Sequence, residues 1–227
     1  MFSAIAPKYD LLNTILSFGI DRYWRKIAVN ELYPQKEGWI LDVATGTADV
    51  ALEVASRMPN SIKIFGADFS FPMLELGDKK ISKNNLKAEI NLGQADGEML
   101  PCYDNSFNGA IVAFGVRNFS NLEIGLSEMR RVLKPGKKMV VLEFSIPELK
   151  VFKLLYMFYF NCLLPLVGKM ISGHQFAYKY LPQSVSRFPS GQEMALLIEK
   201  VGFKEVKCIP LTLGIASIYT GLKNVEI

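Results

Sequence analysis

Between residues 38 and 145, short apolar segments alternate with longer segments whose apolar side chains recur every three or four positions. The short segments predict buried β-strands, and the longer ones predict amphipathic helices. Strands that alternate with helices in this way form a parallel sheet with crossover helices, so the expected fold class is α/β. The segments expected as strands are WILDVA, SIKIFGADFS, AEINLGQADG, GAIVAFGV and KMVVLEFS.

Capping residues mark where two of the helices begin. Ser70 precedes a helix expected to run to about Ile81, and Asn121 precedes one expected to be stopped by Pro135 and Gly136. Both residue types accept hydrogen bonds from the free N–H groups of a first helical turn.

The remaining pattern completes the sheet. Helices are expected over residues 49–58 and around 194–201, where Gly202 ends the second. Residues 203–222 favour two strands around Gly214, as in a hairpin. The expected sheet is therefore seven-stranded and mostly parallel, with helices on both faces.

Length and composition bound the organisation of the chain. Its 227 residues, half of them hydrophobic, suffice for one large domain. We expect a single domain over residues 1–227, with a helical lid segment at 1–36 and an inserted apolar helical region at 146–190. The first residues lack the features of a secretory signal peptide.

The net charge and the number of cysteines indicate which macromolecules and metal ions the chain can bind. The net charge of +4 permits attraction to an anionic membrane surface but gives little support for nucleic-acid binding. Cys102, Cys162 and Cys208 are an odd number at wide spacing, which argues against a disulfide framework or a zinc site and fits a reducing cytosol. We therefore expect no metal and no nucleic acid.

Residues 151–171 are unusually apolar, and Lys153 and Lys169 bracket them. The uncharged part is shorter than the roughly 18–20 residues that a membrane span needs. Two interpretations stay open: a buried or capping helix, and a helix that touches lipid or an apolar substrate.

Three of the expected strands end in a carboxylate, namely Asp42, Asp68 and Asp96. Ligands of a doubly wound sheet bind beyond the carboxyl ends of its strands. Asp68 follows the small-residue turn by about 20 positions, which suits a ribose diol, and Asp96 is placed to accept from an adenine amino group. Gly46 lets the backbone approach a ligand, and Thr47 offers a hydroxyl.

The turn after the first strand distinguishes between nucleotide cofactors. It reads A-T-G-T-A-D, with one glycine where a dinucleotide fingerprint needs three. Asp49 would repel a pyrophosphate but can pair with the ammonium of an amino acid, which favours S-adenosylmethionine over NAD. The alternative is that Asp42 and Asp49 only cap and hydrogen-bond the turn.

Several longer motifs resemble one enzyme family. YDLLNTILSFGIDRYW (9–24) is similar to the signature Y-D-x-M-N-x-x-[LIVM]-S-x-x-x-H-x-x-W of the UbiE/MenG/Coq5 quinone C-methyltransferases, which use S-adenosylmethionine. FGVRNF, RVLKPGKKMVVLEFS, YKYLPQSVSRFP and LTLGIASIYTGLK resemble its other hallmarks. The G-T-A-D turn is similar to that of the menaquinone branch. Asp21 stands where the signature has histidine, and Lys137 stands where it has a second glycine.

The resemblance implies a class I, Rossmann-like methyltransferase fold with S-adenosyl-L-methionine as cofactor. Combined with the strand-end positions, it gives one set of expected cofactor-binding residues: Asp42, Gly46, Thr47, Asp68, Phe69, Asp96, Gly97 and Ala113.

Methylation of a hydroquinone ring carbon requires a phenolate held in line with the methyl sulfonium, so positioning and electrostatics supply most of the catalysis. Arg117 is expected at the cleft rim, where it either stabilises the phenolate or forms a structural pair with Asp10 or Glu143. The full set of expected catalytic residues is Arg117, Asp10 and Tyr9. The expected substrate-binding residues are Asn13, Asn118, Tyr178 and Tyr180.

The expected reaction is methylation of demethylmenaquinol to menaquinol. The alternatives are the equivalent ubiquinone-pathway reaction, methylation of another small phenol or of RNA, and a non-catalytic scaffold in a quinone-synthesis complex. The expected partners are a polyprenyl quinol and a membrane surface, and a homodimer is left open. The expected location is cytoplasmic, peripheral on the inner face of the membrane.

Overall fold

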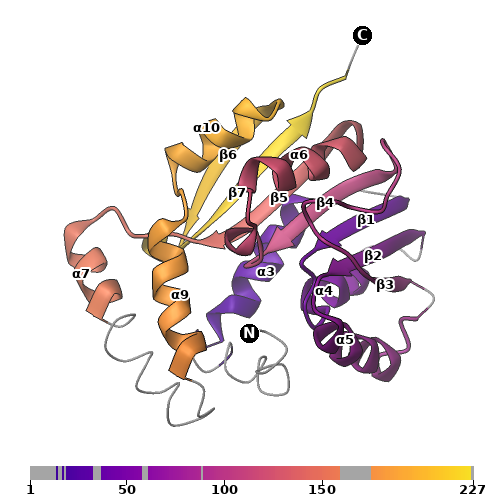
Figure 1. Cartoon of the computed structure of the whole chain (residues 1–227), viewed down its shortest axis with the longest axis horizontal. Helices are drawn as coiled ribbons and strands as arrows, with labels where there is room; N and C mark the ends of the chain where they lie inside the picture. The colour runs from indigo at the N-terminus through magenta and orange to yellow at the C-terminus, as the bar shows by residue number, and fades with distance from the viewer. Residues whose placement is uncertain are drawn as a thin grey trace.

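The computed structural model describes Thr14, Ser17 and residues 19–32, 37–57, 61–87, 89–158 and 175–225, without the side chains of Leu155 and residues 175–179. A seven-stranded sheet in the order β3-β2-β1-β4-β5-β7-β6 forms its centre (Figure 1). The strands are β1 (Gly38–Val43), β2 (Ile62–Asp68), β3 (Ile90–Gln94), β4 (Phe107–Ala113), β5 (Leu133–Phe144), β6 (Phe203–Leu211) and β7 (Ala216–Lys223).

Six strands of the sheet run in one direction, and β7 runs in the opposite direction. β1 pairs in parallel with β2 and β4, β2 with β3, and β4 with β5, whereas β7 is antiparallel to both β5 and β6. The strand order reverses between β1 and β4, so the carboxyl ends of these two strands flank the position where a doubly wound sheet binds ligands. The seven-stranded, mostly parallel prediction is confirmed.

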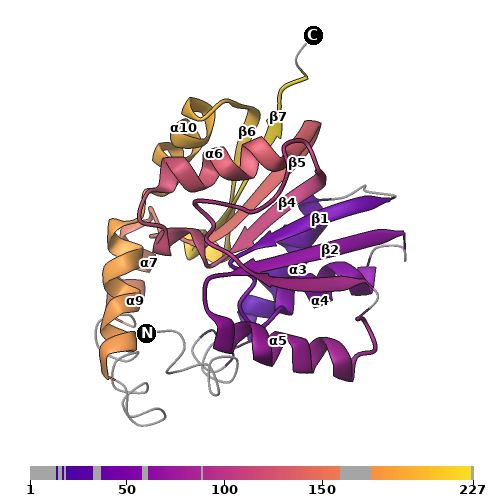
Figure 2. The same cartoon turned by 45° about the vertical axis from the view of Figure 1, so that its right-hand side comes forward.

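Helices cover both faces of the sheet (Figures 1 and 2). They are α3 (Ile20–Glu31), α4 (Asp49–Arg57), α5 (Phe71–Lys83), α6 (Leu122–Val132), α7 (Lys150–Phe158), α9 (Gln175–Arg187) and α10 (Gln192–Lys200), with 3₁₀ turns η2 (Val116–Asn118) and η4 (Thr212–Gly214).

Alternating strand residues supply two cores. Ile40 and Ile111 pack with residues of α3 and α4 on one face. Leu41 and Val112, their neighbours in sequence, pack with residues of α6 and α10 on the other face. Successive side chains of a strand point to opposite faces, so nearly continuous apolar strands bury both sides of the sheet.

The predicted helix boundaries hold in part. The Asn121 side chain accepts a 3.2 Å hydrogen bond from the N–H of Ile124 at the start of α6, as predicted. Ser70 occupies the N-cap position of α5, but its hydroxyl makes no capping hydrogen bond. Gly202, with φ of 98°, follows α10, and the strands around Gly214 form the predicted antiparallel pair.

The end of α6 differs from its prediction. The helix ends at Val132, and Leu133 already pairs with Phe107 of β4. The next pair of this ladder joins Gly109 to Lys138, so Pro135 and Gly136 lie in an irregularity of β5 and do not stop the helix.

Within the apolar region 146–190, the described residues form two helices, α7 and α9, and residues 146–149 and 188–190 are not helical. Residues 159–174, which include Cys162, His174 and most of the unusually apolar segment, lie outside the described residues. Within the described ranges, no helix is both long and apolar enough to cross a bilayer.

Candidate active site

The turn after β1 presents its backbone and only small side chains to the cavity. Ala44, Gly46 and Ala48 all have positive φ, with 57° at Gly46. This left-handed conformation costs a non-glycine residue free energy, and only small side chains occupy it here. The turn thereby leads directly from the end of β1 into the first residue of α4.

Asp68, at the end of β2, holds this turn in place. Its Oδ2 accepts a 2.8 Å hydrogen bond from the N–H of Gly46, and its Oδ1 accepts a 2.7 Å bond from the N–H of Ser70. One carboxylate therefore fixes both the β1 turn and the entry to α5. Burial raises the pKa of Asp68, although these two N–H groups favour its ionised form.

Asp42 lies beneath the turn and does not line the cavity. It is almost completely buried, and its Oδ2 accepts a 2.6 Å hydrogen bond from the hydroxyl of Thr45. Burial raises the pKa of Asp42 to about 7, against the opposing effect of the Thr45 hydroxyl. The geometry supports the alternative in which Asp42 hydrogen-bonds the turn.

Thr47 and Asp49 are also occupied by protein partners. Lys80 of α5 donates to the Thr47 hydroxyl at 2.8 Å and to Asp49 Oδ1 at 2.6 Å. The other oxygen of Asp49 lies 3.3 Å from a guanidinium nitrogen of Arg25. Asp49 therefore has two cationic partners within the chain, so the interpretation that it pairs with a ligand ammonium has no support in this geometry.

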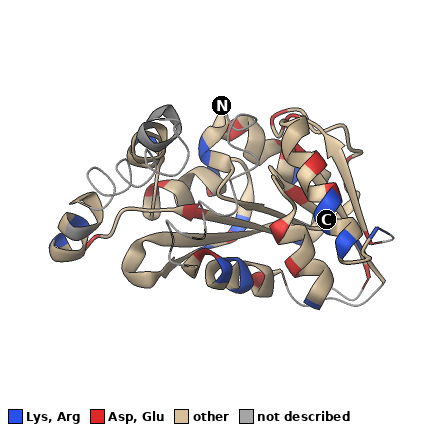
Figure 3. Cartoon of the chain, turned by 90° about the horizontal axis from the view of Figure 1, so that it is seen from below, with Lys and Arg blue, Asp and Glu red and all other residues tan. Residues whose placement is uncertain are grey.

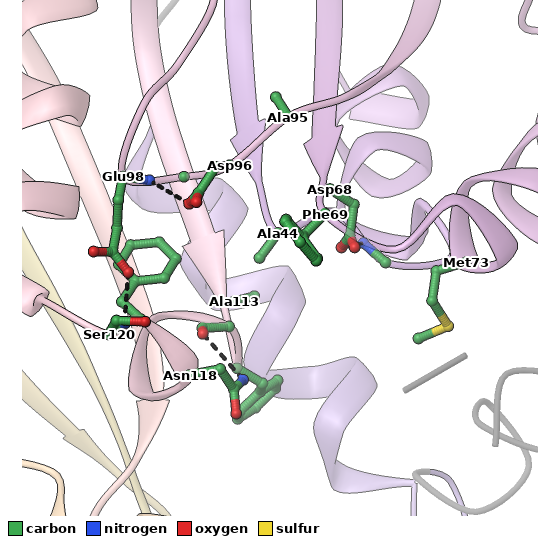
Figure 4. Close-up of a pocket in the computed structure, with 15 residues that line it drawn as sticks. Ala44, Asp68, Phe69, Met73, Ala95, Asp96, Glu98, Ala113, Asn118 and Ser120 are labelled. Atoms are coloured by element: carbon green, nitrogen blue, oxygen red, sulfur yellow. Dashed lines mark hydrogen bonds between the residues drawn. The ribbon is translucent and has the colours of Figure 1, made fainter. Parts of the chain in front are cut away.

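A cavity of about 380 Å³ opens between the carboxyl ends of β1, β2 and β4. Asp68, Phe69 and Met73 lie on one side of it, and Glu98, Ser120 and Asn118 lie on the other (Figure 4). Its lining comprises Ala44, Gly46, Asp68, Phe69, Met73, Ala95, Asp96, Gly97, Glu98, Ala113, Phe114, Gly115, Asn118, Phe119 and Ser120.

The far wall of the cavity follows β4. Phe114 has φ of 57°, and a Cβ on Gly115 would lie only 2.4 Å from the Cβ of Ala44. Only glycine therefore allows the end of β4 to approach the β1 turn this closely. Asn118, in η2, donates to the carbonyl oxygen of Gly115 at 3.1 Å and accepts a 3.0 Å bond from the hydroxyl of Tyr180.

Glu98, in the loop after β3, attaches this loop to the segment that follows β4. Glu98 accepts hydrogen bonds from the N–H groups of Ser120 and Asn121, at 2.5 and 3.0 Å. Asp96 accepts from the N–H of Glu98 at 2.9 Å and stays exposed. These contacts place the β3 loop across the cavity from the turn after β1.

Arg117 is not among the residues that line the cavity. Its guanidinium forms a 2.8 Å ion pair with Glu143, lies over the ring of Phe144 and donates to the carbonyl oxygen of Phe114. Burial raises the pKa of Glu143, and the positive charge of Arg117 opposes that effect. Of the two predicted roles of Arg117, the geometry supports the structural pair with Glu143.

The structure brings most of the predicted cofactor set together. Six of its members line the cavity, and Asp42 and Thr47 do not. Their contact with a bound cofactor stays a prediction. Tyr9, Asp10 and Asn13 lie outside the described residues, as does the side chain of Tyr178.

Sequence reasoning did not assign the remaining lining residues. Phe114, Gly115 and Phe119 belong to the FGVRNF motif, from which only Arg117 and Asn118 were selected. Met73, in the first turn of α5, is an apolar position of the predicted helix and carries no local sign of a ligand contact. The other lining residues not predicted are Ala44, Ala95, Glu98 and Ser120.

The charge of the lining indicates what the cavity accepts. Among its described residues are three acids, Asp68, Asp96 and Glu98, and no Lys, Arg or His. This excess of acids disfavours a pyrophosphate and suits a ligand that carries positive charge. Apolar contacts from Phe69, Met73 and Phe119 fit a flat ring beside a polar sugar. The described residues contain no cluster of metal-ligating side chains.

Known proteins resemble this chain over nearly its whole length, including all the residues that line the cavity. The model of the ubiE/COQ5 methyltransferase family matches residues 1–223. The ubiquinone/menaquinone biosynthesis C-methyltransferase UbiE of Geotalea daltonii is 51% identical, covering 98% of this chain and 94% of that protein. A demethylmenaquinone methyltransferase of Bacteroides fragilis is 42% identical, covering 98% and 91%.

A solved structure shares the fold. The crystal structure of a SAM-dependent methyltransferase from Aquifex aeolicus superposes with a TM-score of 0.65 at 17% identity, over 88% of this chain and 89% of that one. The similarity supports the α/β architecture described above.

Proposed function

The chain belongs to the ubiE/COQ5 methyltransferase family, and we propose that it methylates a ring carbon of demethylmenaquinol to give menaquinol. It is an S-adenosylmethionine-dependent methyltransferase of quinone biosynthesis. The observation that carries the proposal is the family match over residues 1–223, which includes every described residue of the acidic cavity.

The menaquinone branch is favoured by two features. The turn from Gly46 to Asp49 reads G-T-A-D, which is similar to the menaquinone branch of the family. Relatives at 41–42% identity from Porphyromonas gingivalis and Bacteroides fragilis are named demethylmenaquinone methyltransferases. The more similar Geotalea relative carries both pathway names, so the ubiquinone-pathway reaction is the second candidate.

The described residues fit S-adenosylmethionine by their chemistry. Asp68 would accept from the ribose hydroxyls with the lone pairs that its two backbone hydrogen bonds leave free, and Asp96 would accept from the adenine amino group. Phe69 and Met73 would pack against the adenine. The cofactor supplies an electrophilic methyl group on a sulfonium, whose positive charge matches the acidic lining.

The protein's contribution to the reaction is to orient the methyl donor and the quinol ring toward each other and to exclude water from them. The cavity walls from β1 and β4 would hold the methyl donor, and Asn118, which accepts a hydrogen bond from Tyr180, would contact the quinol ring. A phenolate reacts at its ring carbon once that carbon is in line with the methyl group, so alignment supplies much of the rate enhancement. The pair formed by Arg117 and Glu143 would keep this wall rigid.

A polyprenyl quinol resides in a membrane, and α7 offers a surface for contact with one. Val151, Leu154 and Phe158 share one helix face and are 69%, 74% and 58% exposed. Lys150 and Lys153 are exposed beside them, and Tyr156 anchors the opposite side in the protein. Such a helix, apolar on one face and flanked by lysine, suits the interface of an anionic bilayer.

The position of α7 supports the same role. It stands at one end of the molecule, away from the sheet, and carries basic residues (Figures 1 and 3). We therefore propose a peripheral association with the inner face of the membrane through the 146–190 region of a single methyltransferase domain.

The direct test is a methyl-transfer assay with reduced demethylmenaquinol and the ubiquinone-pathway precursor side by side, in mixed micelles. Faster methylation of demethylmenaquinol supports the proposal. Faster methylation of the other quinol assigns the chain to the second candidate. Methylation of neither, by a protein that binds S-adenosylmethionine, overturns both.

A further inference from the structure

Arg25 of α3 lies between two carboxylates on different elements. One guanidinium nitrogen is 2.8 Å from Asp21 Oδ2 and 3.3 Å from Asp49 Oδ2. Asp21 is 4% exposed and accepts a 2.6 Å hydrogen bond from the hydroxyl of Ser17. Asp49 is the first residue of α4 and directly follows the small-residue turn of the cavity. This ion pair therefore joins α3 to that turn.

The same turn is held from the opposite side by α5. Lys80 contacts the other oxygen of Asp49 and the hydroxyl of Thr47. Arg25 and Lys80 thus occupy one oxygen each of a single carboxylate, and the turn is tethered between two helices. A displacement of α3 would alter the position of Asp49 and, through it, of Gly46.

Trp24, the neighbour of Arg25, reaches the other wall of the cavity. Its Nε1 donates a 2.8 Å hydrogen bond to the hydroxyl of Thr212. Its ring centroid lies 6.1 Å from that of Phe114, which lines the cavity, and 6.1 Å from that of Phe144. Consecutive residues of α3 therefore contact the β1 wall and the β4 wall.

We infer that Arg25 is a positioning residue for the methyl donor, because it bridges Asp21 to Asp49 and fixes the turn that carries Gly46. Asp21 supplies the second half of the bridge. In this chain it stands where the resembling signature has histidine, and its carboxylate gives Arg25 a buried counter-charge. The inference rests on S-adenosylmethionine occupying the cavity.

A matched control exists on the same two helices. Arg57, at the far end of α4, pairs with Glu53 and donates a 2.6 Å hydrogen bond to the side chain of Asn30 on α3. It also joins α3 to α4, but away from the cavity. Loss of Arg57 removes an interhelical contact and leaves the β1 turn untouched.

The test compares Arg25→Gln with Arg57→Gln by calorimetric titration of S-adenosylmethionine and by thermal melting. Arg25→Gln is expected to raise the dissociation constant about tenfold, as the loss of one charge-assisted contact would. Arg25→Lys keeps the charge but has a shorter side chain without the planar guanidinium, so its dissociation constant should fall between those of wild type and Arg25→Gln. Arg57→Gln should lower the melting temperature with an unchanged dissociation constant.

Equal dissociation constants for wild type and folded Arg25→Gln would overturn the inference, and so would an equal rise in Arg57→Gln. If Arg25→Gln does not fold, Asp21→Asn decides, since it keeps the side-chain shape and removes one end of the bridge. A dissociation constant of S-adenosylmethionine at least threefold higher in Asp21→Asn than in wild type then supports the inference. A smaller increase overturns it. Failure of the wild type to bind S-adenosylmethionine would instead contradict the proposed function.

Discussion

The guanidinium of Arg117 lies 2.8 Å from the carboxylate of Glu143, and both side chains are almost completely buried. The pair joins η2, at the rim of the cavity, to the end of β5. Glu143 also accepts a 2.8 Å hydrogen bond from the N–H of Phe144. Among the described residues, each charge has the other as its counter-ion, so removal of one partner leaves a buried charge without it.

Glu143→Gln is therefore expected to lower the free energy of unfolding by about 3–5 kcal/mol, the usual cost of breaking a buried pair. Arg117→Met combined with Glu143→Met should cost less than Glu143→Gln alone, because it leaves no isolated charge. Urea titrations measure both effects. If Arg117→Lys has the same free energy of unfolding as wild type but a much lower turnover, a catalytic role for Arg117 is favoured instead.

Asp68→Asn should weaken S-adenosylmethionine binding by roughly ten- to hundredfold, because a charge-assisted hydrogen bond contributes about 1.5–3 kcal/mol. The amide keeps one acceptor for the N–H of Gly46 or Ser70, so the fold should survive. Calorimetric titration measures the change. Asp78→Asn, on the exposed surface of α5, is the control. An unchanged affinity in folded Asp68→Asn would remove Asp68 from the binding site.

Asp42 should make stability depend on pH. Its pKa rises from an ordinary 3.8 to about 7 on folding, so the folded state binds the proton more tightly than the unfolded state. The contribution of this group to stability is therefore greatest below pH 3.8 and declines as pH rises toward 7, by up to about 1.4 kcal/mol per pH unit.

Asp42→Asn removes this titration while it keeps an acceptor for the Thr45 hydroxyl. The difference in unfolding free energy between variant and wild type should shift in favour of the variant from pH 4 to 7 and then level off. Urea titrations across this range provide the measurement. A difference that stays constant with pH would mean that Asp42 ionises normally in the folded protein.

Leu154→Ser should reduce partition onto anionic liposomes about tenfold, because burial of one leucine side chain contributes roughly 1.5–3 kcal/mol. The apparent Michaelis constant for long-tailed quinol should rise, with unchanged affinity for S-adenosylmethionine. Co-sedimentation measures the partition. Leu196→Ser is the matched control, since Leu196 is 55% exposed on α10. Equal losses in both variants, or none in Leu154→Ser, would contradict a membrane role for α7.

Local patterns predicted much of the sheet and of the cavity. The strands are runs of apolar residues, and the parallel topology places Asp68 and Asp96 at one edge without further information. The Asn121 cap also follows from a residue type and its position. Each of these features depends on a few consecutive residues.

Contacts between distant segments could not be predicted in this way. Asp49 looked available for a ligand because Arg25 and Lys80, 24 and 31 positions away, become its partners only after folding. Arg117 suited catalysis and structure equally until Glu143 was placed beside it. The end of α6 was missed because it depends on pairing between Leu133 and Phe107.

The most direct test of the account is transfer of a trideuteromethyl group from labelled S-adenosylmethionine to reduced demethylmenaquinol, with the product analysed by mass spectrometry and NMR. We expect one trideuteromethyl group on the open ring carbon of the naphthoquinol, and much less product with Asp68→Asn at cofactor concentrations near the dissociation constant of the wild type. A label on a hydroxyl oxygen, or no labelled quinone from a protein that binds the cofactor, would contradict the account.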